Sequence, residues 1–159
     1  MEYKFSQEEL ERIDKIKSKY PNSKSALMPV LWLSQKKFGW ISDEVKQLIA
    51  DTLDLQLSQV HGVASFYTMY FKKPMGKYHI QVCTNVSCML LKGEEIYNFV
   101  SSKLKIGNME RTEDGIFSLE EVECMGACGG APMIAVNEDY YEYMDVEKID
   151  RLIEKLASS

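Results

Sequence analysis

The sequence predicts an α+β protein in which an N-terminal helical bundle, residues 1–74, precedes a domain with a mixed β-sheet, residues 75–159. In the first part, apolar residues recur three and four positions apart, the spacing of amphipathic helices. In the second part, short segments of alternating polarity are interspersed with helical patterns in the order β-α-β-β-β-α. The pattern changes at the turn-forming segment 73–76, which contains a proline and a glycine.

Four helices are expected in the first part, and the sequence marks the ends of the first three. Ser6 and Glu9 form a capping box, Gly39 fits a C-terminal stop, and Ser42 fits an N-cap. Pro29 lies in the first turn of the second helix, where a missing N–H costs little. The expected spans are about 6–19, 25–38, 42–53 and 58–67.

In the second part, strands are expected at 78–83, 116–122, 133–136 and 140–144, and helices at 89–104 and 146–156. A tight turn at 137–139 is expected to join the last two strands into a hairpin. Asp145 can cap the last helix. Segment 123–132 contains three glycines and a proline, which predicts a loop.

Composition excludes several classes of protein. With 159 residues, 45% of them hydrophobic, the chain can bury a core without disulfides. The longest uncharged stretch, 55–71, contains six polar residues and is too polar for a membrane span, so no direct membrane insertion is expected. The charged N-terminal segment lacks the apolar region of a secretory signal, so we expect a reducing cytoplasm. No basic block is interleaved with aromatic residues, which argues against a nucleic-acid partner.

All four cysteines lie in the acidic second half, in two close pairs. Cys83 and Cys88 form a C-x4-C motif, Cys124 and Cys128 form a C-x3-C motif, and 35 residues separate the motifs. Each motif lies at the C-terminal end of an expected strand, so the two loops can lie side by side. A [2Fe–2S] cluster needs two thiolates on each iron, and two loops with two ligands apiece meet that demand.

Other interpretations of the cysteines remain open. Structural zinc takes four cysteines at similar spacings and predicts a closed, redox-silent site. A disulfide framework is typical of secreted chains, and four unrelated buried thiols would not need to be paired in sequence. Neither motif has the C-x-x-C spacing of a thioredoxin-type catalytic dithiol.

The surroundings of the cysteines predict a stabilised centre of low potential. Glycines in the second loop would let backbone N–H groups approach sulfur, and a helix beginning near Cys88 would add others. Nearby carboxylates oppose the addition of an electron to an anionic centre. The residues concerned are Gly126, Gly129, Gly130, Glu120, Glu121 and Glu123.

The remaining candidate residues are expected to be structural. His79 lies on a strand four residues before a cysteine, and His61 lies in an apolar helical stretch. The run Phe66, Tyr67, Tyr70 and Phe71 is expected in a core rather than on a docking surface. No glycine-rich nucleotide loop is visible, so NADH and flavin are expected on another chain. The chain is therefore expected to carry electrons and to lack a complete active site of its own.

Three segments together resemble the small [2Fe–2S] subunit of respiratory complex I, called the E subunit in bacteria. They are Cys83-Thr-Asn-Val-Ser-Cys88, Glu123-Cys-Met-Gly-Ala-Cys-Gly-Gly-Ala-Pro132 and Val60-His-Gly-Val-Ala-Ser-Phe-Tyr67. The resemblance covers nearly the whole chain. It implies a thioredoxin-like C-terminal domain behind a helical bundle, and one [2Fe–2S] cluster ligated by Cys83, Cys88, Cys124 and Cys128.

The resemblance also implies a function and partners. The chain would be an electron-transfer subunit of an NADH dehydrogenase (quinone) complex, exchanging single electrons with the FMN of an F-type flavoprotein, the NADH-binding subunit. Other peripheral-arm subunits would join it in the cytoplasm, peripheral to the inner membrane. Equivalent subunits of NAD-reducing hydrogenases and NAD-dependent formate dehydrogenases are similar and remain alternatives, as does a zinc-stabilised interaction module.

Overall fold

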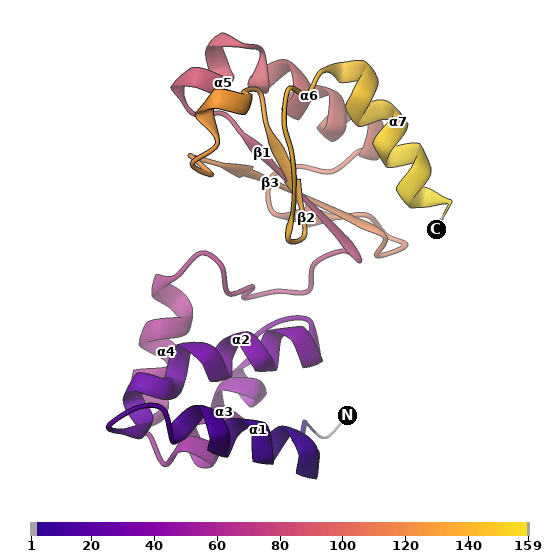
Figure 1. The fold of residues 1–159 in the computed structure, drawn as a ribbon. Helices are drawn as coiled ribbons and strands as arrows, with labels where there is room; N and C mark the ends of the chain where they lie inside the picture. Colours follow the sequence, from indigo (N-terminus) through magenta and orange to yellow (C-terminus); the bar gives the residue numbers. More distant parts are fainter. Residues whose placement is uncertain (1–2, 159) are drawn as a thin grey trace. The chain divides into compact units, whose positions relative to one another are not determined.

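The computed structural model describes residues 3–158. The chain divides into two compact units, Met1–Pro74 and Met75–Ser159 (Figure 1). The first unit is helical and the second contains the sheet, so each is described by itself. None of the helices in the described residues is both long enough and apolar enough to cross a membrane.

Three helix ends in the first unit lie at the capping residues that the sequence predicted. The Ser6 hydroxyl accepts the N–H of Glu9, the Ser42 hydroxyl accepts that of Val45, and Gly39 ends a helix with a φ of 82°. The elements are α1 (Gln7–Lys17), the 3₁₀ turn η1 (Ser23–Ala26), α2 (Leu27–Phe38), α3 (Asp43–Leu53) and α4 (Leu57–Phe66).

Two helix starts in this unit differ from the prediction. The segment expected to open the second helix at residue 25 forms the 3₁₀ turn η1, and the α-helix begins at Leu27. The fourth helix begins at Leu57, one residue before Ser58, because Gln56 is its N-cap. The Gln59 side chain accepts the backbone N–H of Gln56 at 3.3 Å, which satisfies a donor at this helix end.

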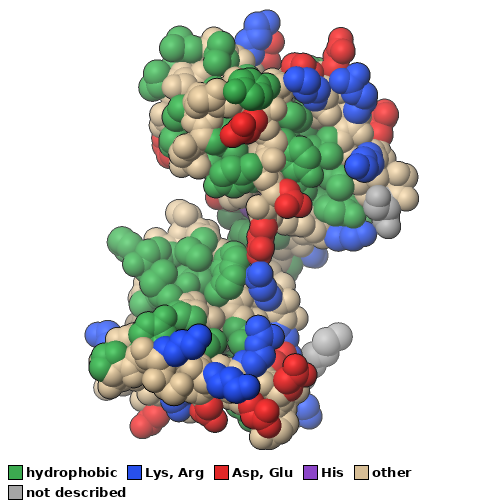
Figure 2. Space-filling view, in the orientation of Figure 1, with side chains coloured by type: hydrophobic (Ala, Val, Ile, Leu, Met, Phe, Trp, Pro, Cys, Tyr) green, Lys and Arg blue, Asp and Glu red, His purple; other side chains and the backbone are tan. Residues whose placement is uncertain are grey.

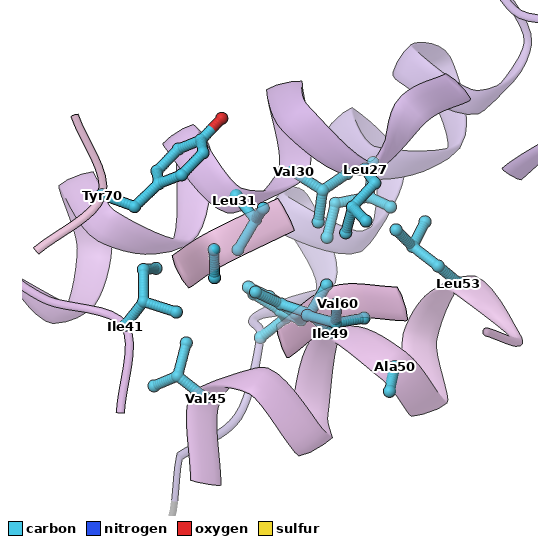
Figure 3. Packing of buried hydrophobic residues seen from close by; sticks show 13 residues of the cluster. Leu27, Val30, Leu31, Ile41, Val45, Ile49, Ala50, Leu53, Val60 and Tyr70 are labelled. Carbon is cyan, nitrogen blue, oxygen red and sulfur yellow. The ribbon is translucent and has the colours of Figure 1, made fainter. Parts of the chain in front are cut away.

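One face of each helix builds the core of this unit (Figure 3). Buried residues from α2, α3 and α4 interlock there, and each large aliphatic side chain contributes about 1.5–3 kcal/mol when fully buried. Tyr70 closes the core, and its hydroxyl donates to the Met28 carbonyl at 3.0 Å. Other members are Leu27, Val30, Leu31, Ile41, Val45, Ile49, Leu53 and Val60.

The second unit is built on a five-stranded mixed sheet of order β2-β3-β1-β4-β5. β1 and β3 are parallel, and the other neighbouring pairs are antiparallel. The strands are β1 (Tyr78–Cys83), β2 (Glu110–Arg111), β3 (Phe117–Val122), β4 (Ile134–Val136) and β5 (Asp139–Tyr141). The helices are α5 (Val86–Leu90), α6 (Gly93–Leu104) and α7 (Val146–Ala157), and the 3₁₀ turn η2 spans Cys128–Gly130.

Helices α6 and α7 pack against one face of this sheet (Figure 1). Alternation along β1 directs Ile80 and Val82 into this core, so His79, Gln81 and Cys83 belong to the opposite face. The core residues from the strands and the two helices are Ile80, Val82, Leu119, Ile96, Val100, Ile149 and Ile153.

Several predicted boundaries in this unit were wrong. The helix expected over 89–104 is two helices, because the chain breaks at Lys92, which has a φ of 75°. The short edge strand β2 was not predicted. The strands expected from residues 116 and 133 begin one residue later. Strand β5 begins at Asp139, which pairs with Val136, and ends before the predicted residue 144.

Candidate metal centre

The parallel pairing of β1 and β3 brings the two cysteine motifs together. Cys83 is the last residue of β1, and it lies opposite Val122, the last residue of β3. The N–H of Thr84 donates to the Val122 carbonyl at 3.1 Å, so the chains leave the sheet side by side. Cys124 follows two residues later. The predicted adjacency of the two loops is therefore confirmed.

The first pair is buried. Cys83 and Cys88 are each 2% exposed, and Cys88 lies within α5. The Cys83 thiol donates to the Glu123 carbonyl at 2.9 Å, which ties the first motif to the second loop. A Cβ atom at Gly93 would lie 2.6 Å from the Cys83 carbonyl oxygen, so only glycine fits there. At the break between α5 and α6, the backbone of Gly93 can therefore pack directly against the backbone of the two cysteines.

The second pair is exposed, and its geometry fits one metal ion. The sulfur atoms of Cys124 and Cys128 are 3.8 Å apart. Two sulfurs that are each about 2.3 Å from a tetrahedral metal lie about 3.8 Å from one another. Gly126, with a φ of 78°, donates its N–H to the Cys124 sulfur at 3.4 Å. This contact is the kind expected of the glycine-rich loop.

The other glycines of this loop have different surroundings. Gly130 is buried, and a Cβ atom there would lie 2.4 Å from the Glu142 carboxyl carbon, so a side chain at this position would require Glu142 to move. Gly129 has open space where its Cβ would be. The helix expected near Cys88 begins at Val86, and Cys88 is its third residue.

The buried cysteine pair belongs to a small apolar cluster that includes residues of the second loop. Burial raises the pKa of the Cys88 thiol to about 11, a backbone hydrogen bond from Met133 opposes that rise, and the sulfurs of Cys83 and Cys128 add to it. Both cysteine pairs therefore contribute to the raised pKa of Cys88. The cluster consists of Cys83, Cys88, Ala131 and Met133, with Val122, Met125 and Ala127 packed against it.

This donor set fits a [2Fe–2S] cluster, which takes two thiolates on each of its irons. All four cysteines are free thiols, arranged as a buried pair beside an exposed pair. Between residues 3 and 158, no three His, Cys, Asp or Glu side chains lie close enough together to hold a metal ion, so the structure pairs the cysteines without gathering three of them at one point.

Of the three acidic residues expected near the site, two contact the first cysteine loop and the third contacts a histidine on the sheet. Glu121 accepts a hydrogen bond from the Thr84 hydroxyl at 2.8 Å, and Glu123 accepts one from the Asn85 amide at 3.0 Å. Both carboxylates therefore reach across to the first loop. Glu120 lies on the sheet, and its carboxylate is hydrogen-bonded to a histidine of β1.

That histidine belongs to a buried polar network that the sequence did not reveal. His79 Nε2 is 2.9 Å from the Glu120 carboxylate, and its Nδ1 is 2.8 Å from the Ser118 hydroxyl. The Ser118 oxygen also accepts the Gly76 N–H at 3.0 Å, and the Gln81 amide donates to Glu120. Alternation along each strand places these residues on one face of that strand, but only the register of β1 against β3 pairs His79 with Ser118 and Gln81 with Glu120.

The other expected structural residues divide between core and surface. Tyr70 is 1% exposed, as predicted, and Phe71 is half-buried, but Phe66 and Tyr67 are exposed, so the prediction that the aromatic run lies in the core was wrong for those two residues. Figure 2 shows hydrophobic side chains gathered over α4. His61 is exposed on the same helix and, with Asp43 and Lys46, lines a shallow groove.

A mixed sheet that carries paired cysteines at the ends of two parallel strands, with helices on one face, defines a class of iron–sulfur electron carrier. The chain belongs to the thioredoxin-like [2Fe-2S] ferredoxin family, whose model matches residues 13–157. The cofactor of this family is a [2Fe–2S] cluster, as the sequence predicted.

Curated relatives match the whole chain rather than the second unit alone. The chain is 37% identical over 149 residues to the E 2 subunit of the NADH-quinone oxidoreductase of Rhizobium meliloti (strain 1021), covering 94% of this chain and 89% of the relative. It is 40% identical over 159 residues to the E subunit of the enzyme of the same name from Rickettsia bellii (strain RML369-C), covering 98% and 95%. The resemblance drawn from the motifs is confirmed.

The fold also occurs within a longer solved protein. An NAD+-reducing [NiFe]-hydrogenase in its air-oxidized state superposes with a TM-score of 0.74 at 22% identity. The match covers 83% of this chain and only 23% of that one. At this identity the likeness concerns the fold alone.

Proposed function

We propose that this chain is the electron-transfer subunit of an NADH:quinone oxidoreductase, with one [2Fe–2S] cluster on Cys83, Cys88, Cys124 and Cys128. The observation that carries the proposal is the adjacency of the two cysteine motifs at the level ends of β1 and β3. The full-length similarity to E subunits of NADH-quinone oxidoreductases supports the choice of complex.

The residues around the proposed cluster control its exposure to water and the charge in its surroundings. The buried pair and its apolar cluster keep water from one side, whereas the exposed pair leaves the other side open to a partner. Gly126 directs an N–H toward sulfur, which stabilises negative charge there. Glu121 and Glu123 add negative charge at the rim, which favours a low potential. When bound, the cluster supplies a one-electron couple.

The proposal extends to partners and location. No nucleotide loop was found in the sequence, so NADH and FMN are assigned to an F-type flavoprotein partner, and the electron exchange takes place with that FMN. We infer that other peripheral-arm subunits complete the assembly, which we place in the cytoplasm, peripheral to the inner membrane.

Colour and spin test the cluster. The full chain, purified from a host that assembles iron–sulfur clusters, is expected to be red-brown and to show an S = 1/2 signal after reduction with dithionite. Cys124→Ser should lose or weaken the signal, because an alkoxide is a harder and more basic ligand than a thiolate. Ser87→Ala, in α5 between Cys83 and Cys88, should retain it. A colourless preparation with one zinc per chain would contradict the proposal.

Co-purification tests the choice of complex. The tagged chain is expected to bring down a flavoprotein that oxidises NADH together with quinone-reducing partners. Recovery with hydrogenase or formate dehydrogenase subunits would assign it to one of those assemblies instead. The sequence identity of 37% and 40% to the two E subunits favours the quinone-linked complex.

A further inference from the structure

The two cysteine pairs differ in their access to solvent. Cys83 and Cys88 are each 2% exposed, whereas Cys124 and Cys128 are both exposed. The two exposed sulfur atoms are already 3.8 Å apart. Any thiol reagent therefore meets the second pair first when no cluster covers it.

We propose that Cys124 and Cys128 of the cluster-free chain form a reversible disulfide, which makes the loading of the cluster depend on a thiol reductant. The oxidant is a small-molecule disulfide such as glutathione disulfide. The link to cluster loading rests on the proposed function, because it requires these two cysteines to be ligands. The modification itself rests only on their exposure and separation.

The chemistry balances as two thiol–disulfide exchanges. The thiolate of one exposed cysteine attacks the small-molecule disulfide, a mixed disulfide forms, and one small thiolate leaves. The second cysteine then attacks the protein sulfur of the mixed disulfide and expels the second small thiolate. Two electrons pass from the cysteine pair to the reagent, and the two protons of the cysteines are taken up by the two small thiols released.

The loop between the exposed cysteines has room for this bond. The sulfurs must approach from 3.8 Å to about 2.05 Å. Gly126, inside the ring, and Gly129, just after it, each have open space where a side chain would begin. The flanking backbone is held, since the Glu123 carbonyl accepts the Cys83 thiol and the Gly130 carbonyl accepts the Tyr143 N–H. The movement is therefore confined to the middle of the loop.

The buried cysteines are largely inaccessible to a reagent and are held in place by their neighbours. The N–H of Cys83 is bonded to the Met133 carbonyl at 3.3 Å, and its thiol is bonded to Glu123. Cys88 lies in α5, and Gly93 is packed against the backbone of both cysteines. At 2% exposure of each residue, a small disulfide should reach these sulfurs far more slowly than those of the exposed pair.

A Cys124–Cys128 disulfide would remove two of the four proposed ligands at once. Iron and sulfide could then enter the site only after a reductant had opened the bond. A bound cluster would protect the same pair, because its metal would occupy both sulfurs. The oxidation state of the exposed pair would therefore determine whether the chain can take up a cluster.

Peptide mapping of the full chain tests the proposal. Metal is removed under reducing conditions, the reductant is exchanged away, and glutathione disulfide is added before free thiols are trapped with N-ethylmaleimide. Thiols at Cys124 and Cys128 should disappear at least tenfold faster than those at Cys83 and Cys88, and a Cys124–Cys128 peptide should appear. Iron and sulfide should then restore visible absorbance only after dithiothreitol is added.

Two variants make the test specific. Cys128→Ser should stop at a stable mixed disulfide between Cys124 and glutathione, whereas Cys88→Ser should still form the Cys124–Cys128 bond. Equal rates at all four cysteines, a bond from Cys124 to Cys83 or Cys88, or no bond at all would overturn the proposal. A chain that is isolated with zinc and forms this disulfide once the zinc is removed would support the modification while contradicting the proposed function.

Discussion

At the scale of single residues, Glu123 connects the two cysteine loops by both of its polar groups. Its backbone carbonyl accepts the Cys83 thiol, and its carboxylate accepts the Asn85 amide. The first contact needs only the backbone, so it survives a change of side chain. The second places a negative charge beside the site, and this charge can be removed without removing the acceptor atom.

Glu123→Gln is therefore expected to raise the reduction potential. One charge removed at roughly 10 Å in a medium of intermediate dielectric changes the energy of an added electron by about 1 kcal/mol. For a one-electron couple this corresponds to about 40 mV. Spectroelectrochemistry measures the shift. Glu113→Gln, in the exposed turn before β3, is the charge-matched control and should leave the potential unchanged. Equal shifts in the two variants would show that the position of Glu123 is irrelevant.

The buried polar network predicts a cost in stability. Ser118→Ala leaves the Gly76 N–H and the His79 Nδ1 without their shared partner, and Ser118 is fully buried. The free energy of unfolding should fall by about 1–3 kcal/mol. The matched control is Ser65→Ala, whose exposed hydroxyl donates to a carbonyl of its own helix and should change the value by less than about 0.5 kcal/mol. Urea titration compares the two, and equal effects would argue against the network.

At the scale of elements, the break between α5 and α6 depends on Gly93. Gly93→Ala should destabilise the second unit by about 2 kcal/mol or more, because its Cβ would collide with the Cys83 carbonyl. Gly62→Ala is the control, since Gly62 lies inside α4 and its Cβ would meet nothing within 4 Å. That change should stabilise the chain by about 0.5–1 kcal/mol. In thermal unfolding, the midpoint temperature should fall for Gly93→Ala and rise for Gly62→Ala. A fall in both variants would contradict this explanation.

The elements that sequence reasoning found are those with local signals. Ser6, Gly39, Ser42 and Asp145 mark helix ends through their own backbone and side-chain chemistry, and the structure uses each of them. Strand β1 was predicted at its observed bounds because its alternation is regular.

The elements that were missed depend on contacts between distant residues. Apolar positions continue at helical spacing across the break between α5 and α6, and only the approach of Gly93 to Cys83 reveals it. Strand β2 consists of two exposed charged residues, so no hydrophobic pattern could mark it. The pairing of the cysteine loops was predictable because it follows from strand ends. The turn of Glu120 toward His79 was not, because it requires the register of β3 against β1.

At the scale of the whole molecule, each unit has a core of its own. The buried cluster around Leu31 and Ile49 lies entirely within residues 1–74, and the clusters around Ile80 and Cys83 lie entirely within 75–159. A unit with its own core can in principle fold alone. The cysteines all lie in the second unit, so the first contributes none of the four proposed ligands.

A fragment of residues 75–159 is therefore expected to fold and to take up the same cluster as the full chain. Its spin signal after dithionite should match that of the full chain in shape and in spins per mole. The complementary fragment, 1–74, should remain helical by circular dichroism and colourless. A 75–159 fragment that is colourless or aggregated, beside a coloured full chain, would contradict the independence of the two units.

The level ends of β1 and β3 have a consequence for how such chains can vary. Both cysteine motifs are anchored where their strands stop, so the length of the polypeptide that joins the strands does not set the distance between the motifs. Extra residues in the exposed turn at 112–115 would lengthen that polypeptide and leave the sulfur atoms where they are. Related chains are thus free to differ in the number of residues between the second and third cysteines, while the spacing inside each motif stays constrained.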